Sequence, residues 1–249
     1  KICGRGKRVV VALPLRWSRK LSLAAIIAAT IFFTLIVPVK AAEPERIISN
    51  SADWRDVYSV MLFGSLTNRN AAFLVSDRHS VLMADSIPQN AHVWVMSSTR
   101  VPFTTGYDNY LRGRGITVEA FQSGNLNLEL AKQVNTTNFV IVDDSYGYNA
   151  IAVAPYAVSS NSYVLFADET NIDEVDSFLT DKKAGKVLIY GHVDRVVKTT
   201  LAKYNPDIIN IDGDRFANNI EIVKRYQELS HSKQVVLTNG EFIEQEIIS

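Results

Sequence analysis

The chain has 249 residues, enough for one large domain or two ordinary ones, and its 47% hydrophobic and 21% charged residues are typical of globular protein. Residues 1–41 hold eight of the 26 basic residues and none of the 26 acidic ones, so the remaining 18 bases leave the body with a net charge of about −8, which argues against a nucleic-acid partner. The single cysteine, Cys3, lies in that basic leader, which excludes a disulfide scaffold or a thiolate metal site from the body.

The leader contains a nearly unbroken hydrophobic run, residues 21–38, that follows three basic residues. The Val-Lys-Ala sequence ending at Ala41 matches the small-x-small pattern of a signal-peptidase site. We expect a hydrophobic signal helix that is cleaved after Ala41. An uncleaved membrane anchor is the alternative, because about 18 apolar residues can just span a bilayer. Both interpretations place the body outside the cytoplasm, secreted or at the cell surface, and limit membrane contact to this segment.

Short apolar runs alternate with amphipathic stretches from Pro44 onward. The runs expected to form strands are residues 46–49, 71–75, 92–96, 116–120, 139–142, 163–166, 187–190, 208–211 and 234–237. The clearest helix is predicted at residues 172–183, where apolar side chains fall on one face and Asn171 and Glu174 have the spacing of a capping box. Strands that are apolar throughout and alternate with helices predict parallel sheets covered on both faces.

A strand-turn-helix pattern occurs three times, at residues 46–62, 139–156 and 234–246. Aligning Ile48 with Ile141, and Ile141 with Val236, gives spacings of 93 and 95 residues. A period of that length indicates repeated domains and not short solenoid units.

Further segments of the first two copies match in the same order. Val93-Trp-Val-Met matches Val187-Leu-Ile-Tyr, Asn127-Leu-Glu-Leu-Ala-Lys matches Asn219-Ile-Glu-Ile-Val-Lys, and Ala72-Phe-Leu-Val-Ser-Asp matches Tyr163-Val-Leu-Phe-Ala-Asp. We therefore expect tandem three-layer Rossmann/flavodoxin-like modules with parallel sheets. The predicted boundaries are 42–136 for the first module, 137–231 for the second and 232–249 for the start of a truncated third.

Ligands of parallel sheets bind beyond the carboxyl ends of the strands, where helix N-termini point. The polar residues at these strand ends are Asp53, Arg55 and Asp56 in the first copy, Asp143, Asp144, Tyr146 and Asn149 in the second, and Glu241 and Glu244 in the third. Such acids can serve as metal ligands or as a general acid and base, but strand-to-helix turns also need them as helix caps. One equivalent position changes from Asp56 to Asn149 to Glu244, so we favour caps and expect no catalytic residue.

Other motifs give little support to catalysis or to a cofactor. Asp77-Arg-His79 and His192-Val-Asp194 are not repeated between copies, and no Ser lies in a nucleophile elbow. The four histidines include no pair with zinc-binding spacing. Asp212-Gly-Asp-Arg215 resembles the opening of a calcium loop whose later ligands are missing, and no glycine-rich phosphate loop is present. We expect neither a metal nor a cofactor.

Several segments resemble the type 2 cell-wall-binding repeat family. Asp214-Arg-Phe-Ala-Asn218 is similar to that family's Asp-Arg-Tyr-x-Thr helix start, and Val187-Leu-Ile-Tyr-Gly191 to its strand ending in Gly-Gly. The strand-turn-helix at residues 140–156, followed by the strand from Tyr163, resembles the family's element order. Repeats of this family occur in tandem sets of three, each an open parallel α/β domain, so the chain resembles a divergent member.

The resemblance implies non-catalytic attachment to an anionic polymer of the cell envelope, such as a polysaccharide, or assembly at the cell surface. It also implies modules that pack against one another and against a missing third module. The residues expected to bind the ligand are Asp53, Arg55, Asp56, Asp143, Asp144, Asn149, Asp214 and Arg215.

Two functions of other classes remain open from the residues themselves. An exported hydrolase or transferase would use Asp53, Asp56, Asp143 and His192, and would need these acids and the base to converge at one strand-end cleft. An extracellular receptor built from two α/β lobes would bind a small ligand in a deep cleft between the lobes.

Overall fold

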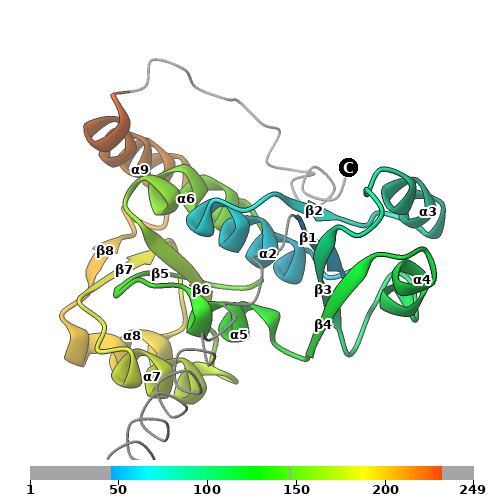
Figure 1. Ribbon diagram of the computed structural model, residues 1–249. Coiled ribbons are helices and arrows are strands. Elements are labelled where there is room, and N and C mark those ends of the chain that lie inside the picture. Colours follow the sequence, from blue (N-terminus) through cyan, green and yellow to red (C-terminus); the bar gives the residue numbers. More distant parts are fainter. Residues whose placement is uncertain (1–45, 146, 232–249) are drawn as a thin grey trace, which may run out of the picture. The chain divides into compact units, whose positions relative to one another are not determined.

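The computed structural model describes residues 46–145 and 147–231 (Figure 1). The predicted signal peptide or anchor with its cleavage site at Ala41, Tyr146, and the predicted third-module start with Glu241 and Glu244 lie outside the described residues. Among the residues described, no helix combines the length and apolar character needed to cross a membrane.

The first half of the described chain forms one parallel sheet with strand order β2-β1-β3-β4. Its strands are β1 (Arg46–Asn50), β2 (Ala71–Phe73), β3 (His92–Ser98) and β4 (Thr117–Ser123). Its helices are α2 (Trp54–Thr67), α3 (Asp77–Asp85), α4 (Tyr107–Gly113) and α5 (Leu126–Gln133). The chain leaves β1 toward one edge and β3 toward the other, so the carboxyl ends of β1 and β3 form a topological switch point.

The second half repeats that arrangement, with strand order β6-β5-β7-β8. Its strands are β5 (Asn138–Val142), β6 (Ser162–Phe166), β7 (Lys186–Tyr190) and β8 (Asp207–Ile209). Its helices are α6 (Gly147–Ser159), α7 (Ile172–Asp181), α8 (Arg195–Leu201) and α9 (Arg215–Ser230), with a 3-10 turn η1 (Ala202–Tyr204) after α8. The predicted α/β class with parallel, Rossmann-like sheets is thus confirmed for the part of the chain that is described.

The helices of the first sheet cover both of its faces, in two pairs. Ile47 belongs to the hydrophobic cluster that includes residues of α2 and α5, whereas its neighbour Ile48 belongs to the cluster that includes residues of α3 and α4. Successive strand residues point to opposite faces, so each of these helix pairs covers one face.

The helix predicted at residues 172–183 begins where expected, at Ile172 after the N-cap residue Asn171, but its predicted capping bond and its predicted C-terminal end are wrong. The side chain of Asn171 makes no capping bond to α7; instead it accepts from the backbone N–H of Asp168 at 3.0 Å and donates to the carbonyl of Phe166 at 3.1 Å. The helix ends at Asp181, and Lys183 then adopts a left-handed conformation with φ 53°. The side chain of Asn171 therefore stabilises the turn before the helix and does not form the predicted capping box.

The two sheets share one hydrophobic core. The cluster that contains Ile47 of the first sheet also contains Val140 and Val164 of the second, all of them fully buried. Helix α2 contacts β6 and α6 of the second half as well as β1 and β2 of its own. The ring of Phe166 meets Trp54 of α2 edge-on at 5.4 Å and Tyr58 at 5.7 Å. Aromatic pairs in this geometry add about 0.5–1.5 kcal/mol each beyond the burial of their area.

Candidate functional site

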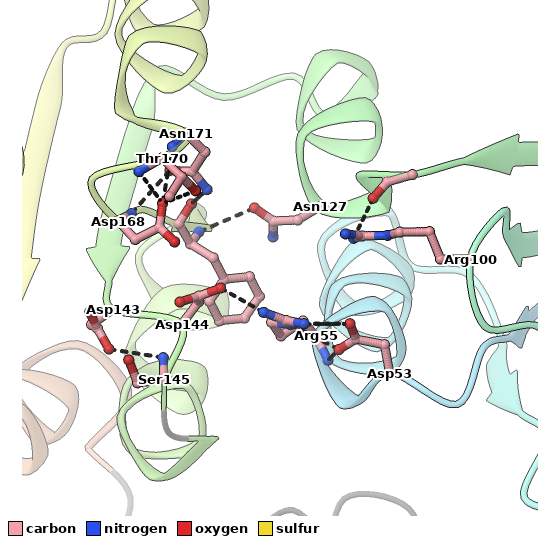
Figure 2. Close-up of polar contacts among 12 residues, drawn as sticks. Asp53, Arg55, Arg100, Asn127, Asp143, Asp144, Ser145, Asp168, Thr170 and Asn171 are labelled. Carbon is pink, nitrogen blue, oxygen red and sulfur yellow. Dashed lines mark hydrogen bonds and ion pairs between the residues drawn. The ribbon is translucent and has the colours of Figure 1, made fainter.

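Arg55 links the start of α2 to the end of β5 (Figure 2). Asp53 caps α2 by accepting from the backbone N–H of Arg55 at 2.9 Å. The guanidinium of Arg55 donates back to both carboxylate oxygens of Asp53, at 2.9 Å from Nε and 2.7 Å from Nη2. Its remaining arm, Nη1, donates to Asp144 Oδ2 at 2.6 Å. The structure thus brings together three residues predicted to form a site, and one arginine satisfies both acids.

The cluster around Arg55 has perturbed pKa values. Burial alone would raise the pKa of Asp53, but hydrogen bonds from the side chain and backbone of Arg55 outweigh it and lower that pKa. The hydrogen bond to Asp53 is the largest of the interactions that raise the pKa of Arg55. Asp168, at the end of β6, has a lowered pKa because hydrogen bonds from Thr170 and Asn171, with the charge of Arg55, outweigh its desolvation. These acids are held ionised, as partners of cations and N–H donors.

Asp56 is buried, and its side chain has a hydrogen-bond partner outside that cluster. Its Oδ2 accepts a hydrogen bond from the hydroxyl of Ser51 at 2.7 Å, and its side chain lies in the first turn of α2. Burial is the largest cause of its pKa shift, and it raises the pKa of Asp56. A carboxyl group with a raised pKa is a candidate general acid or base. However, Asp56 is hydrogen-bonded to a serine of the turn. His192, the base of the hydrolase or transferase alternative, is exposed in the loop after β7.

The predicted site residues of the second half have separate structural roles. Asp143 Oδ1 accepts from the backbone N–H of Ser145 at 2.8 Å, which stabilises the turn between β5 and α6. Asn149 is buried against Gly191, the residue that follows β7. A Cβ at Gly191 would lie 3.0 Å from the amide nitrogen of Asn149, and φ of +77° also requires glycine there. Asn149 therefore fills the switch point between β5 and β7.

Asp214 and Arg215 lie at the start of α9. Asp214 caps the helix by accepting from the backbone N–H of Phe216 at 2.8 Å. The guanidinium carbon of Arg215 lies 4.9 Å from the ring centroid of Phe216 and 5.7 Å from that of Tyr148 on α6. Phe216 is 66% exposed, so this cation and its aromatic neighbour face solvent.

The switch point of the first sheet is filled by the chain itself. Asn50 ends β1, and its side-chain amide donates to the carbonyl of Thr104 and accepts from the N–H of Thr104, both at 2.9 Å. The N–H of Ala52 donates to the carbonyl of Val101 at 2.8 Å. The loop after β3 thus covers the carboxyl ends of β1 and β3, where a ligand of a parallel sheet would bind.

Asn127 is a structurally important residue that was not among the site residues expected from the sequence. It lies on the apolar face of α5, and its Nδ2 donates to Ser59 Oγ at 3.0 Å and to the carbonyl of Val164 at 2.9 Å. Its Oδ1 accepts from the N–H of Phe166 at 3.2 Å. Because β6 is an edge strand, this amide takes the place of a neighbouring strand. An asparagine between the leucines of a buried helix face is the signal that could have identified it.

One pocket of about 390 Å³ lies between α5 and α7. It is lined by Leu128 and Lys132 of α5 and by Glu174 and Phe178 of α7, among others, and by none of the predicted site residues. Within residues 46–145 and 147–231, no group of three or more His, Cys, Asp or Glu side chains is placed to hold a metal ion. Comparison with models of protein families, with curated proteins and with solved structures found no match for this chain.

Proposed function

We propose that residues 42–231 form a non-catalytic attachment unit that binds an anionic polymer of the cell envelope, such as a polysaccharide, outside the cytoplasm. The proposal extends the resemblance to type 2 cell-wall-binding repeats, and each half is then a three-layer, flavodoxin-like module that follows a signal helix or anchor. The acidic body makes local basic groups the points of contact with such a ligand.

The observation that supports this proposal best is the structural use of the polar strand-end residues. Asp53, Asp143 and Asp214 each accept a backbone N–H two residues along the chain, which is the chemistry of a cap or a turn. Arg55 is shared between two carboxylates. A general acid or base must exchange a proton with a substrate, whereas the oxygens of these groups already bind N–H donors within the protein. They stabilise a scaffold, which suits a protein that binds and does not react.

The start of α9 is the point of contact that we favour. In the described part of the chain, the guanidinium of Arg215 contacts two aromatic rings and no carboxylate. An arginine in this state retains all five N–H donors for a carboxylate or phosphate, and a neighbouring exposed ring can stack on a sugar. Binding through Arg215 and Phe216 would therefore be driven by charge and stacking, with a strong dependence on salt.

The test is retention of the purified unit Glu43–Ser249 on isolated envelope material. We expect the wild-type unit to sediment with the envelope, and Arg215→Gln to reduce the bound fraction several-fold. Arg78→Gln, on the exposed surface of α3, removes the same charge elsewhere and serves as the matched control. Retention no better than that of an unrelated acidic protein removes the binding proposal. Equal losses in the two variants leave attachment standing but move it away from Arg215.

A further inference from the structure

Helices α5 and α9 have matching sequences and the same rotational phase, but they differ in burial. The match pairs Asn127–Lys132 with Asn219–Lys224. Leu130 and its equivalent Ile222 are each 1% exposed. Leu128, in contrast, is 2% exposed, whereas its equivalent Ile220 is 58% exposed.

That difference arises because α5 faces the second module and α9 faces solvent. Asn127 binds the open edge of β6, and Leu128 lines a pocket with Phe178 of α7. The equivalent Asn219 is exposed. Helix α9 therefore carries the equivalents of the asparagine and the apolar residue with which α5 contacts the second module. In the described part of the chain, no module lies against them.

The neighbouring helix continues this exposed surface. Helices α6 and α9 pack against each other as α2 and α5 do. Tyr58 of α2, which is 5% exposed, donates to the carbonyl of Ala150 across the module boundary at 2.9 Å. At the spacing of 93 residues its equivalent is Ile151, which is only partly buried. We call Ile151, Asn219 and Ile220 the donor face.

The first module carries the complementary surface. Strand β2 is the edge of its sheet, as β6 is the edge of the second sheet. Every residue of β6 is buried, whereas all three residues of β2 are partly exposed. Helix α3 follows β2 as α7 follows β6, and it exposes Val81 at 45% and Leu82 at 59%. We call β2 together with Val81 and Leu82 the acceptor face.

The backbone of the acceptor face offers most of what Asn219 requires. The sequence match places Phe73 at the position of Val164, whose carbonyl accepts from Asn127. Val75 takes the position of Phe166, and its N–H now donates to His79 Nδ1 at a long 3.3 Å. A side-chain amide can replace that weak contact at little cost.

We propose that the chain assembles head to tail, with the donor face of one copy docked on the acceptor face of a second copy. The second copy is the partner because both halves of the contact lie on this chain, and each half repeats one side of an interface that the chain already forms between its own modules. A contact between unlike faces is heterologous, so it produces a closed ring or an open filament and not a two-fold dimer. This inference concerns assembly and does not rest on polymer binding, but Phe216 and Ile220 are i,i+4 neighbours on α9, so a docked copy would cover part of the surface proposed for the polymer.

Cross-linking between single-cysteine variants tests the proposal. The unit Glu43–Ser249 contains no cysteine, so Ile220→Cys and Leu82→Cys each introduce one thiol. When the two variants are mixed and oxidised, we expect the mixed dimer to exceed either self-linked dimer by at least tenfold. In analytical ultracentrifugation, the average mass of the wild-type unit should increase with protein concentration. Ile220→Asp should raise the dissociation constant of this self-association at least tenfold. Val196→Asp, at another exposed apolar position, on α8, is the matched control and should not change the dissociation constant.

Three results would overturn the proposal. The first is a monomer at every concentration tested, and the second is self-linked Ile220→Cys dimers in excess over mixed ones. The third is association that begins only after residues 232–249 are removed, because the donor face would then belong to the chain's own C-terminal segment. A circular-dichroism spectrum equal to that of the wild type excludes misfolding as the cause of any loss.

Discussion

Replacement of Asn127 by alanine should weaken the contact between helix α5 and the edge of the second sheet. Its amide makes three hydrogen bonds, to Ser59, to the carbonyl of Val164 and from the N–H of Phe166. Both strand residues are buried, so Asn127→Ala leaves a backbone acceptor and a backbone donor unsatisfied at the edge of β6. Each unsatisfied buried group costs about 1–3 kcal/mol, so the two together predict a loss of about 2–6 kcal/mol. That is a large part of the 5–15 kcal/mol typical of a folded domain.

The chain supplies its own control for this substitution. Asn219 is the equivalent residue on α9 and is exposed, so Asn219→Ala should change the free energy of unfolding by less than about 0.5 kcal/mol. Urea unfolding at low protein concentration, followed by circular dichroism, measures both variants. Hydrogen exchange adds a local readout, because the amide of Phe166 should lose protection in Asn127→Ala alone. Equal and small losses in the two variants would falsify the role assigned to Asn127.

The remaining predictions concern charge and backbone strain. The lowered pKa of Asp53 means that its contribution to stability is present above its unfolded pKa, near 3.8, and is lost as the pH falls through its folded pKa. Arg55→Gln should therefore lower the melting temperature at pH 7 more than at pH 3. The raised pKa of Asp56 has the opposite sign, since its protonated form favours folding, so stability is lost as the pH rises from the unfolded toward the folded pKa. Asp56→Asn should raise the melting temperature at pH 7 and have little effect at pH 3; a fall at pH 7 would contradict this. Gly191→Ala should cost more than Gly213→Ala in urea unfolding. Both glycines have a positive φ, where an alanine costs about 1 kcal/mol, but only at Gly191 does a Cβ meet a buried side chain.

Much of the fold follows from short-range patterns in the sequence. Apolar runs such as Phe139–Val142 predicted strands because a strand buried on both faces needs apolar side chains at every position. Asp53 and Asp214 were predictable as helix caps, because the capping bond joins residues only two apart. Asn171 has the same kind of sequence signal, yet its side chain bonds to the preceding turn, a choice that spacing alone does not decide.

The roles of Arg55 and Asn127 required the tertiary structure. Arg55 pairs with an aspartate 89 residues away, and Asn127 binds a strand 37 to 39 residues away. Neither partner lies within the spacings of two to four residues that sequence patterns encode. A lone polar residue within an apolar pattern marks a buried contact but does not identify the other side.

The sequence by itself determined a duplicated α/β chain with polar turns between its strands and helices. Only the tertiary structure decided what the two copies do differently. Leu128 and Ile220 occupy the same position in matching helices, and one is buried while the other is exposed. The physical reason is that periodicity sets which face of a helix is apolar, whereas burial depends on whether another part of the molecule lies against that face.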